Sequence, residues 1–95
     1  MTFPTVHLNG TSAETLIEGY CNARTAVMAA QDALAQIEFN ARDYYVKGPD
    51  AYPAARKEHT ARLAALAKIA DELLQIAMDV QDQQQEREEQ RAQRY

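Results

Sequence analysis

The stretch FNARDYYVKGPDAYPAARKEHTARLAAL, residues 39–66, decides the fold of this chain. It contains the only Gly-Pro pair in the sequence, and long segments with helical spacing lead into it and out of it. It also holds four of the seven aromatic residues. Because glycine and proline interrupt regular structure, this stretch predicts the turn at which a helical chain reverses direction.

The same region, extended by two residues to Lys68, concentrates positive charge. Between Arg42 and Lys68 there are six basic and three acidic residues, a balance of +3, whereas the whole chain carries −4. The remainder of the chain therefore sums to −7. A net negative chain is poorly suited to binding double-stranded nucleic acid, which usually requires a basic face. A local basic surface can still hold a small anionic ligand.

Length and composition limit the fold to one small domain. A chain of 95 residues buries a thin core, and its apolar residues are mostly alanine, which favours close helix packing. The single cysteine, Cys21, cannot form an intramolecular disulfide, and no Cys/His spacing of the metal-binding kind occurs. No apolar run approaches the length of a membrane span, and residues 1–8 lack the pattern of a signal peptide. We expect a soluble, cytosolic protein without metal or cofactor.

The chain divides into an arm, two helices and a tail. Residues 1–10 are predicted to form an extended arm, because Pro4 disfavours helix and apolar and polar residues alternate after it. Thr11 and Glu14 form a capping-box pattern that predicts a first helix over about residues 11–40. After a turn over residues 42–50, Asp50 is the predicted N-cap of a second helix over about 51–80.

Apolar residues recur along both predicted helices at alternating steps of four and three, the repeat that packs one helix against another. Pairing the two rows in opposite directions keeps the sum of paired residue numbers at 96 or 97, as an antiparallel hairpin requires. The predicted fold is therefore all-α, a long antiparallel helical hairpin with an extended N-terminal arm. Together the two rows form the predicted seam between the helices. They are Leu16, Tyr20, Ala23, Val27, Ala30, Leu34, Ile37 and Ala41, and His59, Leu63, Leu66, Ala70, Leu73, Ala77 and Val80.

A second apolar row lies outside this seam. Either the arm covers it, or a partner hairpin completes a helical bundle; because the arm is so short, we expect a homo-oligomer. The apolar repeat stops at Gln81, so residues 81–95 are predicted to be a polar helical extension or a frayed tail. The second row comprises Ile17, Cys21, Met28 and Ala35, followed by Ile69, Leu74, Ile76 and Met78.

Catalytic chemistry is not indicated. In the aligned hairpin Cys21 lies about 24 Å along the helix from His59, too far for a nucleophile and its base. A lone cysteine on an alanine-rich helix is usually a small buried apolar residue. The carboxylate pairs at 71–72 and 88–89 are adjacent in sequence and point to different sides of a helix. We therefore expect a protein that is not an enzyme.

The candidate ligand-binding residues gather around the turn. A structural interpretation explains the tyrosines as a cap over the open end of the hairpin and His59 as a packed imidazole. It does not explain Arg56 and Lys57, because cations near a helix N-terminus oppose the helix macrodipole. A bound anion would reverse that argument, and nearby rings could stack on a nucleobase. The candidates are Tyr44, Tyr45, Lys47, Tyr52, Arg56, Lys57, His59 and Arg62.

Two segments, VHLNGTSAETLIEGY and NARDYYVKGPDAYPAARKEHTARLAAL, carry a resemblance. They are similar to a group of small tailed-bacteriophage proteins that share an HLNGTS-like start, an RDYY–GP turn and an EH-x-x-R helix. The resemblance covers roughly residues 6–80. Most of the group has no assigned function, so it implies a phage origin more than an activity.

Small phage proteins of this size commonly act against host immunity. Some resemble sponges, oligomers that sequester cyclic-oligonucleotide or ADP-ribose-type signals in the host cytoplasm. Others block a host protein by direct contact or assist virion assembly. The leading hypothesis is a non-enzymatic sponge for an anionic nucleotide, and the alternative is a helical protein-interaction module.

Overall fold

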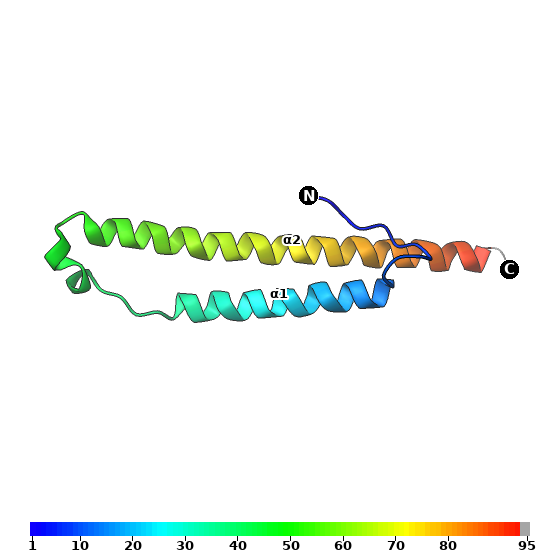
Figure 1. The fold of residues 1–95 in the computed structure, drawn as a ribbon, viewed down its shortest axis with the longest axis horizontal. Helices are drawn as coiled ribbons and strands as arrows, with labels where there is room; N and C mark the ends of the chain where they lie inside the picture. The colour runs from blue at the N-terminus through cyan, green and yellow to red at the C-terminus, as the bar shows by residue number, and fades with distance from the viewer. Residues whose placement is uncertain (94–95) are drawn as a thin grey trace.

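A computed structural model describes residues 1–93 of the chain. It contains two α-helices, α1 (Ala13–Ala35) and α2 (Ala51–Gln93), joined through two short 3-10 helices, η1 (Ala41–Asp43) and η2 (Tyr45–Lys47). The two α-helices lie side by side in opposite directions, and α2 extends past both ends of α1 (Figure 1). The predicted all-α hairpin is confirmed.

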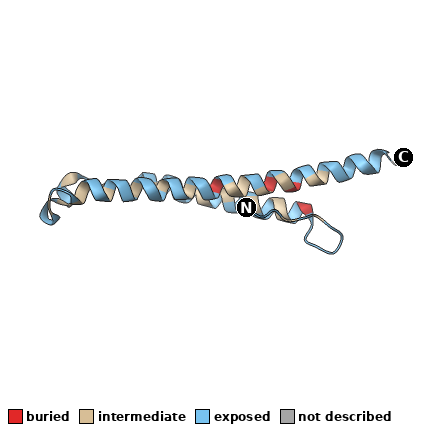
Figure 2. Cartoon of the chain, turned by 90° about the horizontal axis from the view of Figure 1, so that it is seen from above, coloured by how far each residue is buried: buried red, intermediate tan, exposed pale blue. Residues whose placement is uncertain are grey.

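The molecule is a rod. Its extents are 73 × 21 × 20 Å and its radius of gyration is 20.7 Å, whereas a compact chain of this length has a radius of about 12 Å. Within residues 1–93 only Ala13, Ala70, Ala77 and Val80 are buried (Figure 2). Because α1 can cover only one side of α2, the single hairpin has no thick hydrophobic core.

The register of the two helices agrees closely with the apolar repeat. A hydrogen bond of 2.7 Å joins Gln84 Nε2 on α2 to Glu14 Oε1 on α1, and these residue numbers sum to 98, within two of the predicted pairing. The α2 positions of the seam all point inward. Ala70, Ala77 and Val80 are buried, while the remaining four, including His59, are half-buried.

The first helix is shorter than predicted. It ends at Ala35 rather than near Asn40, so Ile37 and Ala41 do not extend the helical seam, and Ile37 is exposed. The Asn40 N–H instead donates to Asp43 Oδ2 at 2.8 Å, and the Asp43 N–H donates to the Asn40 carbonyl at 3.0 Å. This local network competes with continued helix.

The chain then reverses through η1, η2 and Gly48. Gly48 has φ of +107°, a conformation that residues with a Cβ rarely adopt, and Pro49 follows it. Helix α2 begins at Ala51, directly after the predicted cap Asp50, and Pro53 occupies its first turn. The Gly-Pro pair therefore completes the reversal and leads directly into α2.

The N-cap of α1 is Ser12 and not the predicted Thr11. The Ser12 hydroxyl accepts a hydrogen bond from the Thr15 N–H at 3.2 Å and donates to Thr15 Oγ1 at 2.8 Å. Glu14 therefore has no part in a capping box with Thr11. Its carboxylate instead contacts Gln84 on the other helix.

The second helix continues far beyond the predicted end near residue 80. It remains helical through Gln93, so residues 81–93 form the polar extension rather than a frayed tail. Residues 94 and 95, which complete the predicted tail, lie outside the described part of the chain. Since α1 begins opposite Gln84, the last turns of α2 project past the two-helix contact (Figure 1).

The extended arm crosses α2 and is held by one side chain. The Gln83 amide accepts a hydrogen bond from the Val6 N–H at 2.9 Å and donates to the Pro4 carbonyl at 2.9 Å. The arm is thus anchored to the distal part of α2, and from there it runs back toward the middle of the rod (Figure 1). Among the residues of the second apolar row, Met28, Ile69 and Met78 stay exposed.

We expect buried residues of the seam to contribute most to the free energy of unfolding. Val80 has 0% exposure, so Val80→Ala should lower the free energy of unfolding by about 2 kcal/mol, roughly 0.8 kcal/mol for each methyl lost plus a small cavity term. Chemical denaturation followed by circular dichroism measures this change. Val46→Ala is the matched control, because Val46 is 95% exposed and should change stability by less than about 0.5 kcal/mol. Equal effects of the two substitutions would contradict the seam.

Candidate functional site

An aromatic cluster closes the hairpin end, with Phe39 at its centre. The Phe39 ring lies edge-on to three others, with centroids 4.9 Å from His59, 5.9 Å from Tyr52 and 6.3 Å from Tyr44. Tyr44 and Tyr52 also approach each other, at 6.0 Å. All four side chains are half-buried. Three of the predicted ligand-binding residues, Tyr44, Tyr52 and His59, therefore pack together in the fold.

Cations lie beside this cluster on the first turns of α2. The guanidinium carbon of Arg56 stands 5.9 Å from the centroid of the Tyr52 ring, a cation–π distance. Arg56 and Lys57, with Pro53 and Thr60, line a shallow hollow of about 340 Å³ on the surface of α2. Two positive side chains and one hydroxyl thus converge on an open space large enough for a phosphate group.

The start of α2 offers fewer free backbone N–H groups to an anion than the sequence predicted. The Ala51 N–H donates to the Gly48 carbonyl at 3.4 Å, the Ala54 N–H donates to the Asp50 carbonyl at 3.2 Å, and Pro53 has no N–H. Arg56 and Lys57 also stand in the second turn, where the field of the helix dipole has largely decayed. Anion binding in this hollow would depend on side chains.

The other predicted site residues lie around the same end of the rod. Tyr45 is 70% exposed on η2, where Lys47 is also exposed. Arg62 is exposed on α2 but does not line the hollow. Tyr45 is therefore the ring of this region that packing leaves available for stacking.

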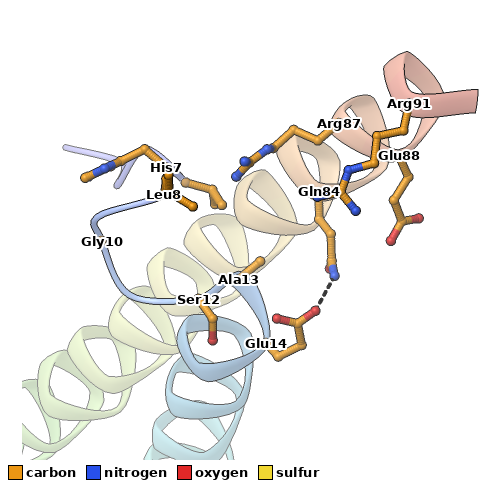
Figure 3. Close-up of a pocket in the computed structure, with 11 residues that line it drawn as sticks. His7, Leu8, Gly10, Ser12, Ala13, Glu14, Gln84, Arg87, Glu88 and Arg91 are labelled. Atoms are coloured by element: carbon orange, nitrogen blue, oxygen red, sulfur yellow. Dashed lines mark hydrogen bonds between the residues drawn. The ribbon is translucent and has the colours of Figure 1, made fainter. Parts of the chain in front are cut away.

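A second hollow, of about 310 Å³, lies at the opposite end of the rod (Figure 3). The arm, the start of α1 and the last turns of α2 enclose it together. Arg87 extends toward His7 and Leu8, and the Glu14 carboxylate lies on the other side, bonded to Gln84. Positive and negative side chains alternate around this space, so it favours no single sign of ligand charge. Its lining is Val6, His7, Leu8, Gly10, Ser12, Ala13, Glu14, Gln84, Arg87, Glu88 and Arg91.

The sequence did not indicate the glutamines that build this end. Gln83 binds the arm and also donates to Asp79 Oδ2 at 2.8 Å, and Gln84 binds the start of α1. Both lie in the polar segment after residue 80, where the apolar repeat has stopped. Gln84 continues the seam by one further step, since it follows Val80 by four residues, whereas Gln83 does not fall on this spacing. This spacing is the sequence feature that could have identified Gln84.

Cys21 and the ionisable residues show no catalytic arrangement. Cys21 is exposed, which corrects the expectation that it is buried. In residues 1–93 no group of three or more His, Cys, Asp or Glu side chains is placed to hold a metal ion. No helix in the described part of the chain is both long and apolar enough to span a bilayer.

Comparison with known proteins adds no family to these observations. No protein-family profile, no curated protein and no solved structure matches the chain.

The aromatic cluster should stabilise the hairpin end. Phe39→Leu removes three edge-to-face contacts, and since one aromatic pair contributes about 0.5–1.5 kcal/mol, we expect a loss of about 1–3 kcal/mol in unfolding free energy. Urea denaturation measures it. Tyr45→Leu, a change at an exposed ring, should shift the midpoint little. A Phe39→Leu variant as stable as the wild type would show that the cluster does not close the hairpin.

The glutamine contacts should hold the arm. Gln83→Ala removes the partners of Val6 and Pro4, so the Val6 N–H should exchange with solvent many times faster, as followed by hydrogen-exchange NMR. The loss of unfolding free energy should be about 0.5–1.5 kcal/mol for each hydrogen bond that is not replaced by water. Gln85→Ala, at an exposed position, is the control. Unchanged protection of Val6 would mean that other contacts retain the arm.

Proposed function

We propose that this chain is a non-enzymatic binding protein that sequesters a small anionic nucleotide at the hairpin end. The observation that carries the proposal is the hollow lined by Pro53, Arg56, Lys57 and Thr60. Two cations face it without an acidic side chain in its lining, although the chain as a whole is acidic. A phosphate group would neutralise this local charge and accept a hydrogen bond from the Thr60 hydroxyl.

A nucleotide suits this place better than a bare phosphate because aromatic rings adjoin the cations. Arg56 already lies over the Tyr52 ring, and a planar base can stack on a guanidinium or on a tyrosine. Tyr45 offers an exposed ring at the same end of the rod. The ligand class is a cyclic oligonucleotide or an ADP-ribose derivative, both of which combine phosphate with a base.

The resemblance to small phage proteins supports a biological role for such binding. Sequestration requires affinity and abundance but no reaction, and no cofactor is needed. The protein would act in the cytoplasm of the infected host and lower the free concentration of an immune signal. We propose that it does so as a homo-oligomer, since exposed apolar residues remain on the isolated hairpin.

Calorimetry with a panel of cyclic dinucleotides, cyclic trinucleotides and ADP-ribose derivatives tests the proposal. At least one should bind saturably to the wild-type protein, and Arg56→Glu/Lys57→Glu should abolish that binding. Stability should change by less than about 1 kcal/mol, since a surface cation–π contact of about 0.5–1 kcal/mol is the main interaction lost. Tyr45→Ala should weaken binding by about 1–3 kcal/mol if its ring stacks on a base.

The control is Arg42→Glu/Lys68→Glu, which changes the net charge equally, from −4 to −8, outside the hollow. At about 0.15 M salt, where the Debye length is about 8 Å, this change outside the hollow should lower affinity much less than Arg56→Glu/Lys57→Glu does. Failure of every ligand to bind the wild type would overturn the proposal. If both double variants bound the ligand equally well, the ligand would not bind in this hollow.

A protein-interaction module remains the second candidate, and a different surface favours it. Ile17, Cys21, Arg24 and Met28 recur at helical spacing on one side of α1, and Met28 is 40% exposed. The Arg24 Nε atom is buried without a hydrogen-bond partner in the described residues. Under this alternative, Met28→Glu should remove the effect on the host while nucleotide binding stays unchanged.

A further inference from the structure

The isolated hairpin exposes much more surface than a folded monomer of its mass. Its accessible surface is 7412 Å², whereas a compact monomer of 10.7 kDa exposes about 5,500 Å². The excess is about 1,900 Å² for each chain. Two chains that buried this excess together would lose close to 4,000 Å², which lies in the range of obligate dimer interfaces, about 2,000–5,000 Å².

An apolar groove on the rod provides a surface for such contact. It has a volume of about 300 Å³, and both helices line it, with Leu16, Gly19, Tyr20 and Ala23 on α1 and Leu73 on α2, while Thr11 and Thr15 line one end. Ile69, 43% exposed, precedes Leu73 by four residues and therefore adjoins it on the surface of α2. The groove is thus continuous with an exposed apolar side chain that can enter the same groove on a second copy.

The space in front of Gly19 in this groove is not filled by any other part of the hairpin. A Cβ added at this position would meet no atom within 4 Å, so nothing inside the hairpin requires a glycine there. In the interior of a helix glycine costs about 0.5–1 kcal/mol relative to alanine. A helix from another chain, approaching closely enough to touch the backbone, accounts for both the missing side chain and the groove.

The charge distribution selects the direction in which the second copy lies. Residues 1–24 and 71–93, which form the arm half of the rod, carry nine acidic and three basic side chains, a balance of −6. Residues 25–70, the hairpin half, carry five acidic and six basic side chains, a balance of +1. A parallel pair would place the two strongly negative halves side by side over their whole length, whereas an antiparallel pair places part of each beside the weakly positive half of its partner.

We infer that a second copy of this chain packs antiparallel along the groove formed by Leu16, Gly19, Tyr20, Ala23 and Leu73, to give a symmetric four-helix dimer. Such a pairing is isologous, because the same surface of both copies is used. On a helical projection, Pro53, Lys57 and Thr60 lie on roughly the opposite side of α2 from Leu73, and Arg56 lies about 100° from it. The dimer therefore leaves the hairpin-end hollow open, and the inference does not depend on the nucleotide proposal.

Energy transfer between labelled subunits tests the direction. In a Cys21→Ser background, which removes the native thiol, Val46→Cys labels the hairpin end and Gln90→Cys labels the arm end. Dimers with donor and acceptor both at 46 should show little transfer, because the labels lie apart by a distance on the order of the 73 Å rod. Dimers with donor at 46 and acceptor at 90 should show strong transfer. The reverse pattern would overturn the antiparallel arrangement.

Substitution in the groove tests the surface. Gly19→Lys should leave the hairpin folded, because the position is open and lysine is a better helix former, yet weaken self-association at least tenfold by placing a charge in the interface. Sedimentation equilibrium measures the association and circular dichroism the fold. Thr25→Lys adds the same charge at an exposed position elsewhere on α1 and should not alter the association.

Each alternative result has a defined meaning. A wild-type protein that is monomeric throughout the micromolar range would overturn the inference, as would a Gly19→Lys variant that associates like the wild type. Equal weakening by Gly19→Lys and Thr25→Lys would show that net charge, and not this groove, controls association. Dimerisation should persist in Tyr45→Ala, which alters the ligand site without changing the charge balance and so separates this inference from the ligand site.

Discussion

The packing of α1 along one side of α2 is the contact on which the rest of the structure depends. Helix α1 has 23 residues and α2 has 43, so little more than half of α2 has a neighbouring helix. Each seam residue is shielded from one direction only, and most remain half-buried. A two-helix seam fixes direction and register well, but it removes little apolar surface from water. The shape of the rod and the open groove beside Gly19 both follow from this limit.

The two ends of the seam are closed by different chemistry. At the hairpin end, edge-to-face aromatic contacts around Phe39 hold the connection against α2. At the arm end, the amide side chains of Gln83 and Gln84 bind the backbone of the arm and the carboxylate of Glu14. The aromatic end carries Arg56 and Lys57 beside its rings, without an acidic side chain in the lining of their hollow. The amide end mixes charges of both signs and mainly anchors the chain.

Charge asymmetry along the rod connects the proposed ligand site with the proposed dimer. The basic residues gathered near the turn can hold an anion in the hollow of Arg56 and Lys57. The same asymmetry favours an antiparallel partner, whose acidic half lies beside the basic end. The groove and the hollow share no lining residue.

The sequence by itself determined the elements that depend on near neighbours. Alternating steps of four and three predicted two antiparallel helices and their register, because a helix brings residues three and four apart onto one face. Gly48 and Pro49 located the reversal, since only certain residues accept its backbone angles. The clustering of cations around the turn was also visible in the sequence and drew attention to the hairpin end.

Tertiary structure decided what depends on residues far apart in the chain. Helix α1 stops at Ala35 because Asn40 bonds Asp43 and Phe39 packs against Tyr52 and His59 from the next helix. Gln83 binds arm residues 77 and 79 positions away, and no local pattern can encode such a partner. The open groove beside Gly19 likewise exists only because two helices meet there. Periodicity shows which face of a helix is apolar, whereas only the packed helices show which part of that face is left uncovered.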